Sequence, residues 1–345
     1  MTGNAVDRGR NGERSGAQTL LLLSEPVNAL ILRALGSGPK QQTDLRLAAG
    51  SPAQTTLRAR LNRLVEIDAI EKHRRNKFPG VLEYELRPAG RELLGIADVV
   101  DRWLERRPER PLLLGENAAR AVVRSLAEGW STTILRALSA RPLSLTELDS
   151  LIGSLSYPSL ERRLSALRFA ELVKWQPSNG RGTPYVVTNW LRLGVAPLAA
   201  ASRWERRRRP ELQPPRSLDV EAAFLLTMPL LGSLGELSGT CRLVAGPLTG
   251  KRDLAGVMAE VDNGKVVSCK TNLQGNPNAW ALGSVPAWFS ALIDNDRDLL
   301  EVGGDAQFAN ALIERMHRVL FAPPATRKQT AELDAAASIE DDGSS

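Results

Sequence analysis

Apolar residues recur at intervals of three and four along the start of the chain. This spacing predicts a helix over residues 20–35, a short helix that begins at Thr43, and a third helix with Ser51 as N-cap and Pro52 in the first helical position. The connections between them are short and rich in turn-forming residues. The pattern therefore predicts three consecutive helices.

The pattern then changes from helical spacing to alternation. Apolar and polar residues alternate over residues 70–78 and 81–88, on either side of a polar tip that contains Pro79 and Gly80, which predicts a β-hairpin. A last amphipathic helix covers residues 90–107. Three helices, a hairpin and a closing helix are the element order of a winged helix-turn-helix domain.

The same pattern returns further along the chain. Residues 31–45, ILRALGSGPKQQTDL, are echoed at 134–148 by ILRALSARPLSLTEL, an offset of 103. This self-similarity indicates a duplicated domain of about a hundred residues. Beyond the third helix an offset of 101 aligns two tyrosines and two tryptophans, which are Tyr84 with Tyr185 and Trp103 with Trp204.

The proline-rich stretch 210–217 separates the repeats from a part with another pattern. That part is predicted to hold a helix at 219–231, three strands between 239 and 273 with a tight turn at 262–265, and two closing helices. The predicted fold class is mainly α with α+β: two winged helix-turn-helix repeats followed by a smaller α+β domain. The predicted boundaries are 1–17 disordered, 18–110 first repeat, 111–209 second repeat, 210–217 linker, 218–323 third domain and 324–345 disordered acidic tail.

Charge is unevenly distributed between these parts. Residues 1–216 hold 35 Lys and Arg against 22 Asp and Glu, whereas residues 217–345 hold 10 against 17. The asymmetry favours a polyanionic partner for the repeats, where arginine outnumbers lysine and suits bidentate contact with phosphate or guanine. The alternative is a basic surface that contacts only solvent.

The motifs of the first repeat resemble those of the HxlR-type winged-helix transcriptional regulators. ILRAL, TDL, SP, LRARLNRL and YELRPAGRELLGIADVVDRWLERR follow one another in the order and spacing of that family. The resemblance covers residues 20–107 and, with greater divergence, 118–209. It implies DNA binding. Because members generally act as homodimers, the tandem resembles a dimer made in one chain.

The third helix of the first repeat is the candidate contact with double-stranded DNA. Leu57, Leu61 and Leu64 share one face, which leaves the opposite face to enter the major groove. There Arg58 suits guanine and Asn62 suits adenine, and the basic hairpin suits the phosphate backbone or a minor groove. The alternative is the solvated face of an ordinary helix. The candidate DNA-binding residues of this repeat are Gln54, Thr55, Arg58, Asn62, Lys72, Arg74, Arg75 and Lys77.

The second repeat offers weaker DNA-binding chemistry. Glu161 stands where the first repeat has Arg58, and the hairpin carries one arginine. We expect the two copies to contact different half-sites with unequal strength, or the second copy to serve partly as a pseudo-dimer partner. The oligomeric state stays open between a monomer with pseudo-dimer repeats and a homodimer. The candidate DNA-binding residues here are Tyr157, Ser159, Arg162 and Arg181.

The element order after residue 218 is similar to the sterol-carrier-protein-like fold, in which a curved sheet and helices enclose an apolar tunnel. The resemblance covers residues 219–321 and rests on this order and on the motif GGDAQF. It implies a hydrophobic small-molecule ligand. The alternative is that the aromatic side chains fill the core. The candidate ligand-binding residues are Met258, Trp280, Trp288, Phe289 and Phe308.

Catalytic and membrane signatures are missing from the sequence. It holds two histidines, His73 and His317, and no GxSxG, Walker, GxGxxG or metal-spaced motif, so no enzyme activity, cofactor or metal is expected. Cys241 and Cys269 lack CxxC spacing, which suits a reducing cytoplasm. No apolar run approaches the roughly 20 residues of a membrane span. We expect a cytoplasmic protein without a membrane partner.

These patterns predict a ligand-responsive DNA-binding transcriptional regulator. Its two winged helices act as an intramolecular pseudo-dimer, and its third domain senses a small apolar molecule. The alternative is a protein that binds or sequesters such a molecule, with the winged helices as a scaffold. Salt separates the two, since counterion release makes DNA binding depend steeply on ionic strength.

Overall fold

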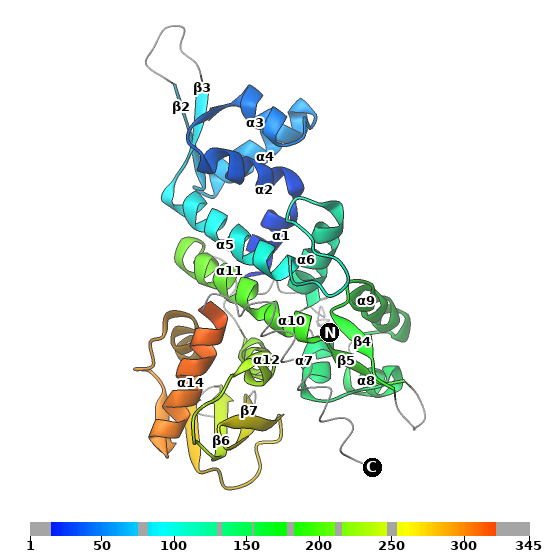
Figure 1. Ribbon diagram of the computed structural model, residues 1–345, viewed down its shortest axis with the longest axis vertical. Coiled ribbons are helices and arrows are strands. Elements are labelled where there is room, and N and C mark those ends of the chain that lie inside the picture. The colour runs from blue at the N-terminus through cyan, green and yellow to red at the C-terminus, as the bar shows by residue number, and fades with distance from the viewer. Residues whose placement is uncertain are drawn as a thin grey trace, which may run out of the picture.

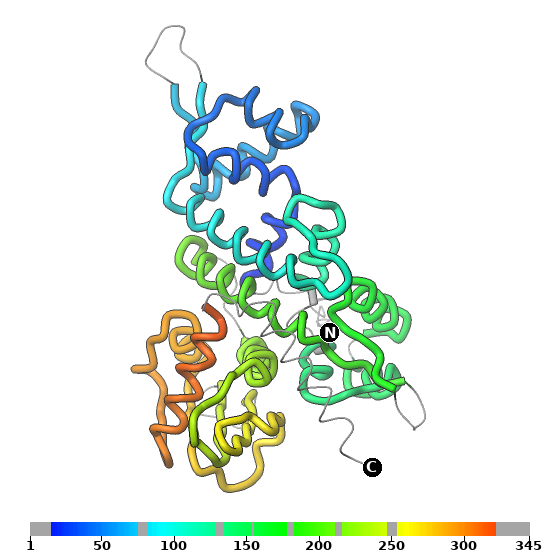
Figure 2. The backbone as a smooth tube through the Cα atoms, viewed as in Figure 1, coloured from blue at the N-terminus to red at the C-terminus, as the bar shows by residue number. Residues whose placement is uncertain are grey.

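The computed structural model describes residues 15–74, 82–129, 133–153, 155–177, 183–210, 216–246 and 254–321. These residues form a mainly helical molecule with three sheets, which agrees with the coarse form of the predicted fold class. Three parts follow one another along the chain (Figures 1 and 2), and we call them the N-terminal unit (15–107), the middle unit (116–210) and the C-terminal unit (216–321). Most of the predicted linker and the predicted disordered ends lie outside the described residues.

The N-terminal unit has helices packed around a short sheet. Two of its strands form the predicted hairpin, and a third strand joins the hairpin by pairing with β3, which gives the order β1-β3-β2. The hairpin tip, residues 75–81, lies outside the described residues. The elements are α1 (Ala17–Ser24), α2 (Pro26–Gly36), β1 (Lys40–Gln41), α3 (Gln42–Ala48), α4 (Gln54–Glu66), β2 (Ile70–Arg74), β3 (Leu82–Leu86) and α5 (Pro88–Leu104).

The single helix predicted over residues 20–35 is wrong, because α1 and α2 are separate helices bent by 84°. The break falls at Glu25, since Pro26 has no N–H for the helical ladder and its ring favours the first position of a new helix. Among the described residues, no single helix is long and apolar enough to cross a membrane, although this bent pair meets the two criteria when taken together.

The predicted N-cap of the third helix is also corrected. Gly50 and Ser51 have φ angles of +80° and +57°, and they belong to the end of α3. The N–H of Gly50 donates to Leu47 O at 3.1 Å and that of Ser51 to Arg46 O at 2.8 Å, the pattern of a Schellman motif. The helix α4 therefore begins two residues later than predicted, at Gln54.

The middle unit has the same order of elements as the N-terminal unit. In each unit a central tyrosine pairs with one residue on either side, which are Lys40 and Lys72 for Tyr84, and Leu143 and Trp175 for Tyr185. The elements are α6 (Asn117–Gly129), α7 (Thr133–Ala140), α8 (Leu145–Leu151), α9 (Tyr157–Phe169), β4 (Val173–Trp175), β5 (Tyr185–Val187), α10 (Asn189–Leu193) and α11 (Val195–Arg208).

The closing helix differs between the two units. It is continuous in α5, whereas the middle unit breaks it at Gly194 into α10 and α11. Pro197 accounts for the break, because it has no N–H to donate to the carbonyl of Leu193 and its ring crowds that carbonyl.

The C-terminal unit is a five-stranded sheet with helices packed on it. The strand order is β10-β9-β6-β7-β8, with β6 and β9 parallel and the other neighbours antiparallel. The predicted tight turn is confirmed between β7 and β8, where Asn263 and Gly264 both have positive φ. The elements are α12 (Ser217–Thr227), a 3-10 turn η1 (Met228–Leu230), β6 (Gly239–Ala245), β7 (Ala255–Asp262), β8 (Lys265–Lys270), β9 (Ala279–Gly283), α13 (Val285–Phe289), a π-helical turn η2 (Ser290–Asp294), β10 (Glu301–Gly304) and α14 (Ala306–Phe321).

The long helix α11 brings the three units together. It packs against α1 and α5 of the N-terminal unit and against α14 and η2 of the C-terminal unit (Figure 1). Ion pairs reinforce the contact of α11 with η2, where Asp294 pairs with Arg206 at 3.1 Å and with Arg207 at 3.0 Å. A further ion pair joins α7 to α12 of the C-terminal unit, where Arg136 pairs with the buried Glu221 at 2.5 Å.

Candidate nucleic-acid interface

The helix α4 buries one face and exposes the other, as its sequence predicts. Leu57, Leu61 and Leu64 are at most 1% exposed and join the core of the N-terminal unit. Four candidate side chains lie on the exposed face. One of them contacts α3, because Gln54 Oε1 accepts a hydrogen bond from Gln42 Nε2 at 3.2 Å. The exposed candidates are Gln54, Thr55, Arg58 and Asn62.

The hairpin places its basic residues on the same side as this helix. Successive strand side chains point to opposite faces of a sheet, so Lys72 and Arg74 share a face with Tyr84, which is paired with Lys72. Burial raises the pKa of Tyr84, and the nearby positive charge of Arg58 partly offsets that rise. Arg58 therefore lies beside the basic face of the hairpin.

The opposite face of the hairpin is acidic. Glu71, Glu83 and Glu85 lie there with His73, whose Nε2 is 3.9 Å from a Glu83 carboxylate oxygen. One ligand-type atom from each of Glu71, His73 and Glu85 lies within 4.8 Å of the others. Because this negative face repels phosphates, DNA is expected to approach the hairpin from the α4 side. The candidates Arg75 and Lys77 lie outside the described residues.

The corresponding helix of the middle unit, α9, presents different chemistry. Leu160, Leu164 and Leu167 are buried, while Tyr157 is 46% exposed. Of the remaining candidates, Arg162 is exposed, Ser159 is partly buried, and Arg181 lies outside the described residues. The strand β4 carries Trp175, 52% exposed, with the Arg168 guanidinium 3.7 Å above its ring. Aromatic and acidic side chains therefore replace part of the basic surface seen in the N-terminal unit.

The candidate ligand-binding residues of the C-terminal unit fall into two sets. Met258 and Trp280 both pair with Arg242 across the sheet and are partly exposed on one face. Trp288 and Phe308 are buried at 0% and 1% exposure among the helices. The first set therefore lies on a partly exposed sheet face and the second in the buried layer of helices. Their neighbour Phe289, 7% exposed, belongs with the second set.

The side chain of Trp288 is held as a core residue. Its Nε1 donates to Val244 O at 2.7 Å, and its ring meets the edge of Phe224 with centroids 4.7 Å apart. Both faces of the indole are thus occupied by protein atoms in the buried layer between helices and sheet.

Buried tryptophans join the N-terminal and middle units. The rings of Trp103 and Trp190 stack with centroids 4.9 Å apart, and each Nε1 donates to the other residue's carbonyl at 2.9 Å. Trp204 Nε1 donates to Ala89 O at 3.1 Å. Trp103 and Trp204 are packing residues at this joint. The part played by Trp190 has no signal in the sequence, because an isolated position does not show a partner 87 residues away.

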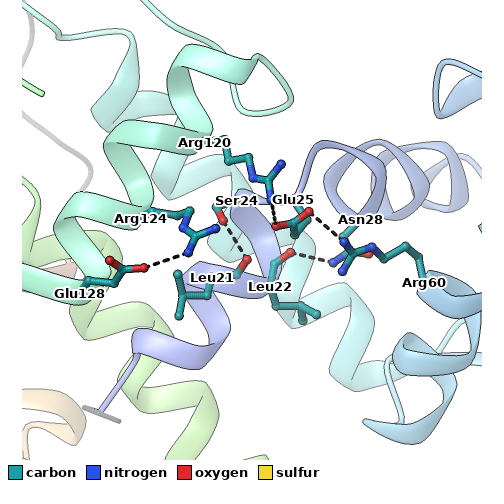
Figure 3. Close-up of polar contacts among 9 residues, drawn as sticks. All are labelled: Leu21, Leu22, Ser24, Glu25, Asn28, Arg60, Arg120, Arg124 and Glu128. Carbon is teal, nitrogen blue, oxygen red and sulfur yellow. Dashed lines mark hydrogen bonds and ion pairs between the residues drawn. The ribbon is translucent and has the colours of Figure 1, made fainter. Parts of the chain in front are cut away.

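A polar cluster at the start of α2 was also missed by the sequence analysis. Glu25 accepts hydrogen bonds from Arg60 on α4 at 2.9 Å and from Arg120 on α6 at 2.7 Å (Figure 3). The Glu25 side chain is 18% exposed. One carboxylate thereby connects α4 with the middle unit.

Comparison with known families finds a match in the N-terminal unit. Residues 22–110 match the HxlR-like helix-turn-helix family model, and no curated protein matches the chain. The match covers α2, α3, α4, the described strands of the hairpin and α5, and so includes the helix and the strand that carry the basic residues. The N-terminal unit is therefore similar to a family of DNA-binding transcriptional regulators, the HxlR-like helix-turn-helix proteins.

Proposed function

We propose that this protein is a transcriptional regulator that contacts double-stranded DNA through α4 and the adjoining hairpin. The observation that carries this proposal is the shared basic face, where Arg58 lies beside Tyr84 and Lys72 and Arg74 flank the same tyrosine. A helix for the major groove and charged strands for the phosphates then act from one side.

We further propose that the N-terminal and middle units form an intramolecular pseudo-dimer. Under the offset of 101, Trp103 corresponds to Trp204 and Ala89 to Trp190. In one hydrogen bond, Trp103 of the N-terminal unit donates to Trp190 O of the middle unit. In the other, the corresponding residue of the middle unit, Trp204, donates to the corresponding carbonyl of the N-terminal unit, Ala89 O. Such reciprocity is the mark of a twofold interface.

The two halves of this pseudo-dimer are proposed to contribute unequally. The N-terminal unit supplies base and phosphate contacts, whereas α9 presents Tyr157 and Glu161 at the positions of Gln54 and Arg58. The preferred site is then an imperfect palindrome whose half-sites lie about 34 Å apart, one turn of DNA. Footprinting of the single chain is expected to show stronger protection on one half. Equal halves occupied only by two chains contradict the pseudo-dimer.

For the C-terminal unit we propose a sterol-carrier-like, ligand-responsive module. The five-stranded sheet covered by α12 and α14 supports this, and its joint with α7 and α11 gives it a physical connection to the other units. A hydrophobic molecule is expected to raise the thermal stability of the chain according to its excess over Kd.

Salt dependence tests the main proposal against a protein that only sequesters small molecules. Fluorescence anisotropy with a labelled duplex is expected to show log Kd rising linearly with log salt, with a slope of about 0.9 for each phosphate contact. The same titration of the variants Arg58→Ala and Arg162→Ala shows which unit contacts the duplex. Only Arg58→Ala is expected to weaken DNA binding strongly. Salt-independent binding of the duplex contradicts the proposal.

A further inference from the structure

A pocket of about 400 Å³ lies where the N-terminal unit meets the end of α11. Its walls come from α1, α2, α4 and the residues at the end of α11. Figure 3 labels five of the lining residues, which are Leu21, Leu22, Glu25, Asn28 and Arg60. This volume falls within the roughly 300–1,000 Å³ range of small-molecule sites. Its lining includes none of the four DNA-contact candidates of α4 and no residue of the C-terminal unit.

The charged groups on the pocket wall favour an anion. Arg60 and Arg63 of α4 and Arg209 after α11 line it, against the single carboxylate of Glu25. Glu25 is already shared between Arg60 and Arg120, which leaves it little capacity for another cation. The ion pair of Arg63 with Glu66 is 3.3 Å long and largely exposed, so it contributes little and is easily exchanged.

A buried amide on the same wall lacks one partner. Asn28 is 0% exposed, and its Nδ2 donates to Leu22 O at 2.8 Å. Its Oδ1 has no hydrogen-bond partner among the described residues. A buried acceptor without a donor is unfavourable, and a ligand hydroxyl or N–H, or a water held by the ligand, would satisfy it.

The rest of the wall is apolar. Leu21, Leu22, Ile67 and Trp204 line the pocket beside the arginines. A guanidinium fork suits a planar carboxylate, and the leucines and the indole suit a flat apolar body. A neutral apolar molecule would make no use of the positive charge of the arginines, and inorganic phosphate would leave the apolar wall uncovered.

We propose that this pocket binds a small aromatic carboxylic acid. Arg60 and Arg63 hold the carboxylate, and Leu22, Ile67 and Trp204 pack on the ring system. Since both arginines project from α4, the occupied pocket constrains the helix that carries Arg58 and Asn62. This last step rests on the proposed function and makes the acid an effector of DNA binding, whereas the binding step does not depend on it.

Calorimetric titration of the full chain with benzoate, 1-naphthoate and indole-3-acetate tests the binding step, with the matching amides as neutral controls. At least one carboxylate is expected to bind below about 1 mM, and each amide at least about tenfold more weakly, because charge-assisted bonds to arginine are lost. Carboxylates and amides that bind alike, or no binding by any of the three acids, overturn the proposal.

Substitutions test whether the acid binds in this pocket. Arg63→Gln is expected to weaken the tightest acid about tenfold or more, while Arg124→Ala is the control, because Arg124 pairs with Glu128 outside the pocket at 3.1 Å. The melting temperature without ligand is expected to be unchanged in both variants. Equal affinity of Arg63→Gln and wild type overturns the assignment.

The regulatory step has its own readout. Saturating acid is expected to change the Kd for a DNA duplex in wild type and not in Arg63→Gln. If the acid binds but the Kd for DNA does not change, the acid is not an effector, although the binding site itself stands. If the chain binds no DNA with or without acid, the proposed function is contradicted and the acid site is not.

Discussion

The N-terminal and middle units share a framework and differ in the chemistry they present. Tyr84 and Tyr185 occupy the same place in their sheets, yet Tyr84 lies between Lys40 and Lys72, and Tyr185 between Leu143 and Trp175. The buried leucines of α4 and α9 recur at the offset of 103. Core positions therefore determine the backbone, while exposed positions on the same backbone are chemically independent of it.

Substitutions in the buried framework of the two units are expected to have the largest effect, because they lower the stability of the fold. Trp103→Ala removes a buried indole that stacks on Trp190 and donates one hydrogen bond to its carbonyl, so the free energy of unfolding is expected to fall by about 3–5 kcal/mol. Urea denaturation measures this. Trp175→Ala, at a half-exposed position, is the matched control and is expected to change stability by about 0.5 kcal/mol. Similar losses in both variants contradict the interface described here.

Exchanging exposed residues between α4 and α9 tests whether the two units differ in DNA binding. Arg58→Glu gives α4 the residue that α9 has at Glu161, and it is expected to weaken DNA binding roughly a hundredfold through loss of a bidentate contact and added repulsion. Anisotropy at fixed salt measures the change. The reciprocal Glu161→Arg is expected to tighten binding to a duplex that carries two equal half-sites. If Arg58→Glu binds like wild type, α4 does not contact DNA.

The hairpins offer a smaller test of the same difference. Lys72→Ala with Arg74→Ala removes two charges from the face beside Tyr84, so the slope of log Kd against log salt is expected to fall by about two units, with a similar effect on every sequence. Lys174→Ala, exposed on β4 of the middle unit, is the control. An unchanged slope in the double variant excludes the hairpin from the interface.

The smallest expected effect concerns Glu205, which stands where the N-terminal unit has the buried Leu104. Burial raises the pKa of Glu205, although its carboxylate accepts backbone N–H groups of Gly16 at 2.6 Å and Thr19 at 2.8 Å. A raised pKa means that the folded state binds the proton more tightly. The contribution of this group to stability therefore falls as pH rises from the unfolded value through the folded one.

Melting temperatures across pH check this sign. The wild type is expected to lose stability relative to Glu205→Gln as pH rises above about 4.5, the ordinary value for glutamate. A difference between the two proteins that grows in favour of wild type over that range contradicts the direction of the shift.

Local chemistry made part of the fold predictable from the sequence. The leucine spacing of α4 is one example, and the Asn263-Gly264 turn is another, because both depend on residues that are close in the chain. The break at Pro26 was predictable in principle, since proline at a first helical position is a local signal.

Other elements depend on distant partners. The strands β9 and β10 were not predicted, because Ala279, Ala281 and Gly303 have little intrinsic preference for strands. Gly303 is required by packing: a Cβ there would lie 2.2 Å from the ring of Trp280 on the neighbouring strand. No window of sequence around Gly303 contains that tryptophan.

The candidate site shows the same division. The exposed positions of α4 followed from periodicity, whereas the pocket at the end of α11 combines residues from Gln18 to Arg209 and has no local signature. The five apolar candidates of the C-terminal unit followed from residue type, which does not show that two of them lie on the sheet and three on the helices α13 and α14.

The joint made by Trp103 and Trp190 lies within one polypeptide, and this has a consequence for dilution. Two separate subunits fall apart as they become scarce, whereas two surfaces on one chain meet at a local concentration that the connecting segment determines. The joint is therefore independent of how many copies of the protein a cell holds. One copy is sufficient to present both α4 and α9 in a fixed arrangement.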